Sequence, residues 1–135
     1  MKQLSFFFTL IVLSISLLSC SDNPINTITF TNSAQADVSV NFRGTLTNVP
    51  VGATVELTNI LDGEYEYETI YSIPAGATSY EAGDQMSGTL DMQAGTKVLV
   101  YYVSVLQDGN YSIDASVTSS NNLAEDGFLG NPISP

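Results

Sequence analysis

The sequence has no histidine, no tryptophan, one cysteine and only three basic residues. These absences exclude Ser-His-Asp and Cys-His catalysis, zinc sites that need histidine or several cysteines, and an internal disulfide. Fourteen acidic residues give a formal net charge of −11, which repels nucleic acid. No phosphate-binding glycine loop is present. We therefore expect no enzymatic activity and no cofactor. A pair of carboxylates, as in glycoside hydrolysis, is the catalytic alternative that remains.

After residue 20 no segment has the apolar period of about 3.6 residues that predicts a helix. Apolar and polar residues alternate instead, in segments rich in β-branched and aromatic residues. Residues 98–105 (VLVYYVSV) are almost continuously apolar, which is typical of a strand buried on both faces. The pattern predicts an all-β fold, a single antiparallel β-sandwich of about seven strands. The expected strands lie in residues 28–30, 38–42, 55–60, 65–73, 86–92, 98–105 and 111–117.

Two short patterns recur between these segments. The sequence VPVGAT at 49–54 returns as IPAGAT at 73–78 and, more weakly, as AGT at 94–96. Proline and glycine in this order indicate turns between strands. The sequence ILDGEY at 60–65 resembles LQDGNY at 106–111, and Asp-Gly predicts a hairpin in each. The unequal spacings indicate repeated turns and not a solenoid.

The N-terminus has Lys2, then a run from Leu4 to Leu18 that only Ser and Thr interrupt. A helix of these 15 residues rises about 22 Å, less than the roughly 30 Å of a bilayer core. The length fits a signal peptide better than a membrane span. A buried core helix is the structural alternative, but nothing later in the chain offers it a helical partner.

The run ends in Leu17-Leu18-Ser19-Cys20. This stretch resembles the lipobox of bacterial lipoprotein precursors, although Leu18 is larger than the usual residue. The resemblance implies cleavage between Ser19 and Cys20 and acylation of Cys20 by diacylglycerol, with palmitate-type chains. Two or more chains would supply stable membrane anchoring. The alternative is an ordinary secretory signal that leaves Cys20 as a free thiol.

We divide the chain accordingly into a signal peptide (1–19), a lipidated tether (20–26), a β-sandwich (27–118) and a partly disordered C-terminal tail (119–135). Leu123, Phe128 and Leu129 in the tail are candidates to dock on the domain. Ser21, and not Asp, follows the cysteine. By resemblance to enteric sorting, this implies the outer membrane over the cytoplasmic membrane, with the domain facing the periplasm or the cell surface.

The two Asp-Gly-x-Tyr stretches, at 60–65 and 106–111, are similar to a pattern in prealbumin-like sandwiches of bacterial surface proteins. The predicted fold is thus Ig-like or prealbumin-like. Some adhesin repeats of this type carry a Lys–Asn isopeptide bond. Here the candidate Lys97 falls late in the chain and not in the first strand, so the bond is not carried over.

The acidic stretch EYEYE at 64–68 has two interpretations. Its carboxylates are either the solvated face of an edge strand or a site for calcium or a basic partner. Residues two apart on a strand lie about 7 Å from each other, so we favour the solvated face. Asp62, Asp108 and Asp126 each precede a glycine and are candidate calcium ligands in loops.

Seven tyrosines allow a glycan-binding interpretation, because aromatic faces stack on sugars. Tyr65, Tyr67, Tyr71 and Tyr111 share strand faces with apolar residues and are expected in the core. The sequence thus favours a structural or adhesive envelope module that is held to the membrane by lipid and contacts another envelope or surface protein. Capture of a glycan or calcium at the cell surface is the alternative.

Overall fold

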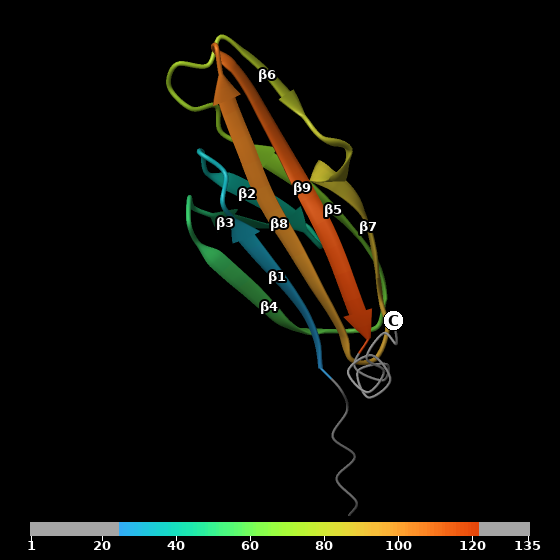
Figure 1. Cartoon of the computed structure of the whole chain (residues 1–135). Coiled ribbons are helices and arrows are strands. Elements are labelled where there is room, and N and C mark those ends of the chain that lie inside the picture. Colours follow the sequence, from blue (N-terminus) through green and yellow to red (C-terminus); the bar gives the residue numbers. More distant parts are fainter. Residues whose placement is uncertain (1–24, 122–135) are drawn as a thin grey trace, which may run out of the picture.

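The computed structural model describes residues 25–121, which form two β-sheets packed face to face (Figure 1). Sheet A has the strand order β4-β1-β8-β9-β6, and sheet B has the order β3-β2-β5-β7. The strands are β1 (Asn26–Asn32), β2 (Val38–Phe42), β3 (Thr45–Val49), β4 (Thr54–Ile60), β5 (Gly63–Tyr71), β6 (Ser79–Ala82), β7 (Ser87–Met92), β8 (Thr96–Gln107) and β9 (Asn110–Asn121). A short 3-10 helix, η1 (Asp84–Met86), precedes β7.

The predicted all-β sandwich is confirmed, with nine strands in the described part in place of about seven. The seven expected segments are β1, β2, β4, β5, β7, β8 and β9; β3 and β6 are additional. Most neighbouring strands are antiparallel, but β1 runs parallel to β8 and β6 runs parallel to β9. Sheet A is therefore mixed.

The recurring glycine turns are confirmed and have a common role. Gly52, Gly76 and Gly95 each occupy the third position of a four-residue turn and have φ values of 75°, 91° and 80°. In each turn the first residue's carbonyl accepts a hydrogen bond from the fourth residue's N–H, over 2.9, 3.3 and 2.9 Å. A positive φ at that position is what glycine allows. All three turns carry the chain from sheet B to sheet A.

The two Asp-Gly stretches differ from each other. Asp108 and Gly109, with φ values of 53° and 79°, form the two-residue hairpin between β8 and β9, as predicted. The hairpin predicted at Asp62-Gly63 is wrong, because β4 belongs to sheet A and β5 to sheet B. The chain crosses between the sheets there, and Asp62 accepts a hydrogen bond of 2.9 Å from the Asn26 side-chain amide. The same dipeptide thus serves a hairpin and a crossover.

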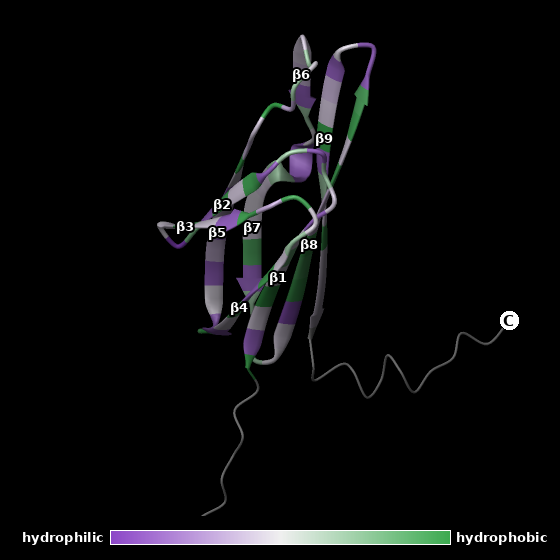
Figure 2. Ribbon diagram, turned by 90° about the vertical axis from the view of Figure 1, so that its left-hand side faces the viewer, coloured by the Kyte–Doolittle hydropathy of each residue, from purple (hydrophilic) through white to green (hydrophobic). Residues whose placement is uncertain are grey.

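The core lies between the sheets, and hydrophobic and hydrophilic bands alternate along the strands (Figure 2). Strand β1 illustrates the cause, since Ile28 and Phe30 point inward between threonines that point outward. The largest fully buried side chains include Tyr102, Tyr111 and Phe30. Buried Asn32 is fully satisfied: its amide nitrogen donates to the carbonyls of Ala36 and Val49, and its oxygen accepts from the N–H of Ala34.

Both ends of the described chain lie at one end of the sandwich (Figure 1). The Asn26 side-chain oxygen accepts a hydrogen bond from the N–H of Thr96, and Thr96 pairs with Asn121. The strands begin at Asn26 and end at Asn121, so the ladder extends slightly beyond the expected domain of 27–118 at each end. Residues 25–121 contain no helix of the length and apolarity that crossing a membrane requires.

Candidate interaction face

The expectation that residues 98–105 are buried on both faces is wrong. Strand β8 alternates strictly over this stretch, with Val98, Val100 and Tyr102 in the core. Residues 25–121 form two layers, so within this part of the chain sheet A has one face toward the core and one outer face. The outward side chains of β8 are nonetheless apolar; Leu99, Tyr101, Val103 and Val105 are 42%, 38%, 43% and 59% exposed. We call these four residues the apolar stripe.

The apolar stripe runs along the central strand of sheet A, between two rows of mainly hydroxyl side chains. On the β1 side, Thr29 and Thr31 pair with Leu99 and Tyr101. On the β9 side, Thr118, Ser116, Asp114 and Ser112 pair with the four stripe residues in order. Asp114 is the one charged residue in these two pairings. The outer face of sheet A therefore has an apolar centre between hydroxyl side chains. Its other charged residues, Glu56, Glu81 and Lys97, lie around this centre.

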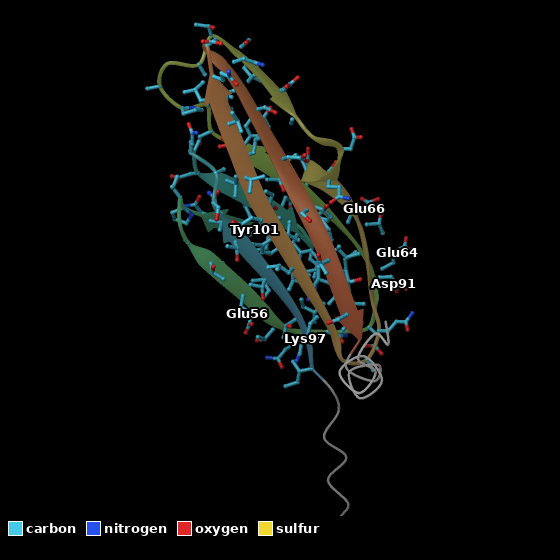
Figure 3. The ribbon with its side chains drawn as sticks, viewed as in Figure 1. Glu56, Glu64, Glu66, Asp91, Lys97 and Tyr101 are labelled. Carbon is cyan, nitrogen blue, oxygen red and sulfur yellow. The ribbon has the colours of Figure 1, made fainter. Side chains whose placement is uncertain are left out.

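A hollow of about 460 Å³ lies at the lower end of this face. It forms because the short threonines of β1 lie between longer side chains of β4 and β8. Figure 3 shows Tyr101 in the middle of the face and Glu56 and Lys97 near its lower end. The hollow thus joins the apolar stripe to a polar rim. Its lining residues are Thr27, Thr29, Glu56, Lys97, Val98, Leu99, Thr118 and Ser120.

The outer face of sheet B has the opposite character. Glu64, Glu66 and Glu68 project from β5, and Asp91 of β7 pairs directly with Glu64. The expectation that EYEYE forms an edge strand is wrong, because β5 lies between β2 and β7. Its carboxylates are still exposed, as expected of a solvated face. An open hollow of about 590 Å³ lies over them.

Two of the three aspartates predicted as calcium ligands, Asp62 and Asp108, lie at opposite ends of the sandwich. Asp62 lies at the end of the sandwich where the chain enters β1, hydrogen-bonded to Asn26. Asp108 lies in the β8–β9 hairpin, and β8 alone spans about 36 Å between the two ends. Asp126 lies outside the described residues. Residues 25–121 contain no cluster of three histidine, cysteine or acidic side chains arranged to hold a metal ion.

The tyrosines divide into core and surface. Tyr67 and Tyr111 are buried as expected, and Tyr65 and Tyr71 pack partly against the core. Burial raises the pKa of Tyr67. Tyr101 is exposed within the apolar stripe, which the sequence did not indicate because both faces of β8 are apolar. Tyr80, on edge strand β6, is 65% exposed. A sugar platform on these strands is limited to the exposed rings.

Ser19 and Cys20, with the whole predicted signal peptide, lie outside the described residues. So do Leu123, Phe128 and Leu129. A comparison of the chain with models of known protein families finds no match, and a comparison with curated proteins finds none either.

Proposed function

We propose that this chain is a non-enzymatic lipoprotein of the bacterial cell envelope whose β-sandwich is a structural or adhesive module. The observation that supports this proposal best is the apolar stripe, four adjacent outward side chains on the central strand of sheet A. Contiguous apolar surface of this kind marks protein interaction sites. Tyrosine at the centre of such a patch is typical of residues that dominate binding energy.

The anchor in this proposal is acylated Cys20, after cleavage between Ser19 and Cys20. Residues 20–25 are at most about 20 Å long when extended, so the sandwich stands close to the bilayer. Strand β1 begins at the end of the sandwich nearest this tether, and the β8–β9 hairpin lies at the far end. The apolar stripe would then run away from the membrane and face sideways, toward neighbouring envelope proteins. We place the protein in the outer membrane.

The anchor is tested by the Cys20→Ala substitution. We expect the unsubstituted protein in the membrane fraction and the variant outside it. Retention of the variant in the membrane contradicts lipid anchoring. Protease treatment of intact cells, with an epitope after Pro135, then separates two orientations. Loss of the epitope indicates the cell surface, and survival until the envelope is opened indicates the periplasm.

The interaction face is tested by placing a photocrosslinking amino acid at position 101 in living cells. A matched probe at Glu66 reports on the outer face of sheet B. We expect a defined protein adduct from position 101 that position 66 does not give. The double substitution Leu99→Thr/Val103→Thr places β-branched, strand-compatible residues at both positions and should reduce the adduct. Equal adducts from both positions contradict the proposed face.

Glycan capture is the second candidate, and one observation favours it. Tyr101 is the next outward residue of β8 after Leu99, which lines the hollow together with threonine and glutamate side chains. A sugar that stacked on the Tyr101 ring would extend toward these hydrogen-bonding groups. Binding on a glycan array that disappears with Tyr101→Ala supports this candidate over a protein partner. Calcium capture is checked by isothermal titration, where absence of heat and of a shift in melting temperature removes it.

A further inference from the structure

The apolar stripe lies beside a row of shorter side chains on the same face of sheet A. Thr27, Thr29 and Thr31 point outward from β1, and we call them the threonine row. Strand β1 runs parallel to β8, and its threonines pair with the outward residues of β8 one by one, as Thr29 does with Leu99. The hollow of about 460 Å³ lies over part of this row. The face therefore has an apolar ridge and, one strand away, a lower row in the same register.

The ridge and the row make this face self-complementary. A two-fold axis parallel to the strands, midway between β1 and β8, would place β8 of each copy over β1 of the other. Such an axis keeps the register, so the apolar stripe of each copy would pack into the threonine row of the other. Long side chains over short ones allow the interdigitation by which sheets pack face to face. Both contacts form together, because a two-fold interface uses the same surface twice.

The charges on the two outer faces favour pairing through sheet A. The outer face of sheet B is acidic and would stay on the far side of each copy; its acids are Glu64, Glu66, Glu68 and Asp91. On sheet A, the same axis places β9 over β4 of the other copy. Asp114 of β9 lies level with Val103 of β8. Glu56 of β4 lies level with Leu99, four residues nearer the start of β8, so these two acids stay about 13 Å apart. Glu81 lies on β6, outside the overlap.

The size and direction of the contact suit two copies on one membrane. Strands β1 and β4 have seven residues each, so four overlapping strands cover roughly 24 by 19 Å, about 450 Å² per copy. The roughly 900 Å² that two copies would bury lies at the low end of specific interfaces. Because the axis runs along the strands, both copies have the start of β1 at the same end. Two chains tethered before β1 would therefore pair side by side, and the shared membrane raises their effective concentration.

We propose that the partner of the apolar stripe is a second copy of this chain, with the stripe of each copy packed into the threonine row of the other. This choice of partner rests on the proposed function, which makes the stripe an interaction site and tethers both copies to one membrane. A different protein on the stripe would exclude the pair and leave the proposed function intact.

The test uses two full-length chains in one cell, each with a different epitope after Pro135. One chain carries the photocrosslinking amino acid at position 101. We expect an adduct with both epitopes, in which the crosslink maps to β1 or β4 of the other copy. The matched probe at position 66, on the outer face of sheet B, should not give this adduct. An adduct with a different protein overturns the pair and keeps the interaction face; absence of any adduct contradicts both.

Thr29→Tyr distinguishes the two kinds of partner in a second way. Tyrosine suits a strand and fills the threonine row, while the apolar stripe is unchanged. In both chains it should lower the yield of the two-epitope adduct roughly tenfold, because the row no longer accepts the stripe of the other copy. Thr89→Tyr, on the outer face of sheet B, is the matched control and should leave the yield unchanged. Circular dichroism of the purified variants establishes that both are folded. A yield that Thr29→Tyr does not reduce overturns the proposal.

Discussion

Thr69 Oγ1 and Tyr102 Oη lie 2.8 Å apart in a hydrogen bond that links β5 of sheet B to β8 of sheet A. Both side chains are buried, so each hydroxyl depends on the other in place of water. The bond joins the two layers directly behind the apolar stripe, because Tyr102 points inward between Tyr101 and Val103. The bond thus holds β8, which carries the apolar stripe, against β5 of sheet B.

Removing one hydroxyl of this hydrogen bond should lower the free energy of unfolding more than removing both hydroxyls. Thr69→Val leaves the Tyr102 hydroxyl buried and unpaired, and we expect a loss of about 1–3 kcal/mol in the free energy of unfolding. Adding Tyr102→Phe to it removes the unpaired hydroxyl and should recover part of that loss. Urea denaturation of the two single variants and the double variant measures the coupling. Thr31→Val, which breaks an exposed hydrogen bond to Thr54, is the control and should cost well under 1 kcal/mol. Additive losses would contradict a hydrogen bond between Thr69 and Tyr102.

Stability should fall between about pH 10 and pH 12. Burial raises the pKa of Tyr102 from 10.0 to about 12, although the hydrogen bond with Thr69 acts in the opposite direction. Above pH 10 the unfolded chain releases this proton and the folded chain keeps it, so alkali stabilises the unfolded state. Below pH 10 the group contributes no pH dependence. Between pH 10 and pH 12 the free energy of unfolding falls by an amount on the order of 2 kcal/mol. Urea midpoints across this range, compared with those of Tyr102→Phe, measure it; identical slopes for the two proteins would contradict the assignment.

Tyr111→Phe should be neutral or stabilising. The Tyr111 side chain is fully buried, and its hydroxyl has no hydrogen-bond partner within residues 25–121. Deleting an unpaired buried hydroxyl removes a desolvation cost, so we expect a change between zero and a gain of about 1 kcal/mol. Thermal or urea unfolding provides the measurement. A loss above 1 kcal/mol would indicate that an ordered water satisfies the hydroxyl.

Replacing a glycine in one of the three turns should lower the stability of the protein because of the backbone conformation at that position, and not because of crowding. An added Cβ at Gly52 meets no atom within 4 Å, yet the φ of 75° is one that few side chains adopt. Gly52→Val should cost about 1–2 kcal/mol, and Gly52→Asn less, since asparagine tolerates a positive φ. Unfolding midpoints of the two variants test the order. Equal losses would mean that the turn conformation does not limit stability.

The alternation of residues predicted most of the strands but missed the two weakest. Strand β6 (Ser79–Ala82) is exposed at every position and lies at a sheet edge, so no apolar alternation marks it. Strand β3 (Thr45–Val49) is also an edge strand, in which only Val49 is buried. Both form because a neighbouring strand supplies hydrogen-bond partners. For β6 the pairing joins residues distant in sequence, such as Ser79 and Asn110, which a local pattern does not contain. Strand β3 pairs with the adjacent β2, as Phe42 with Thr45, but its mostly exposed residues carry no apolar alternation.

The sequence did not predict the apolar stripe for a related reason. In residues 98–105 the inward and outward positions are both apolar, so the alternation that separates them is absent from the sequence. For EYEYE the two faces were clear, but whether the strand lies at an edge depends on its neighbours β2 and β7. Where apolar and polar residues alternate, the local pattern thus determines which side of a strand faces the core. It does not determine which strands flank it or what covers its outer side.

The parallel pairing of β1 with β8 determines how the sandwich would carry a mechanical load. A pull on the chain at Ile25 acts along the axis of β1, whose residues 27–32 pair with β8 while β4 holds the other side. Such a force shears both ladders at once, so many hydrogen bonds must break together. A peeling force would break them one at a time. A domain tethered before β1 and held by a partner on β8 would therefore resist extraction along its strongest direction.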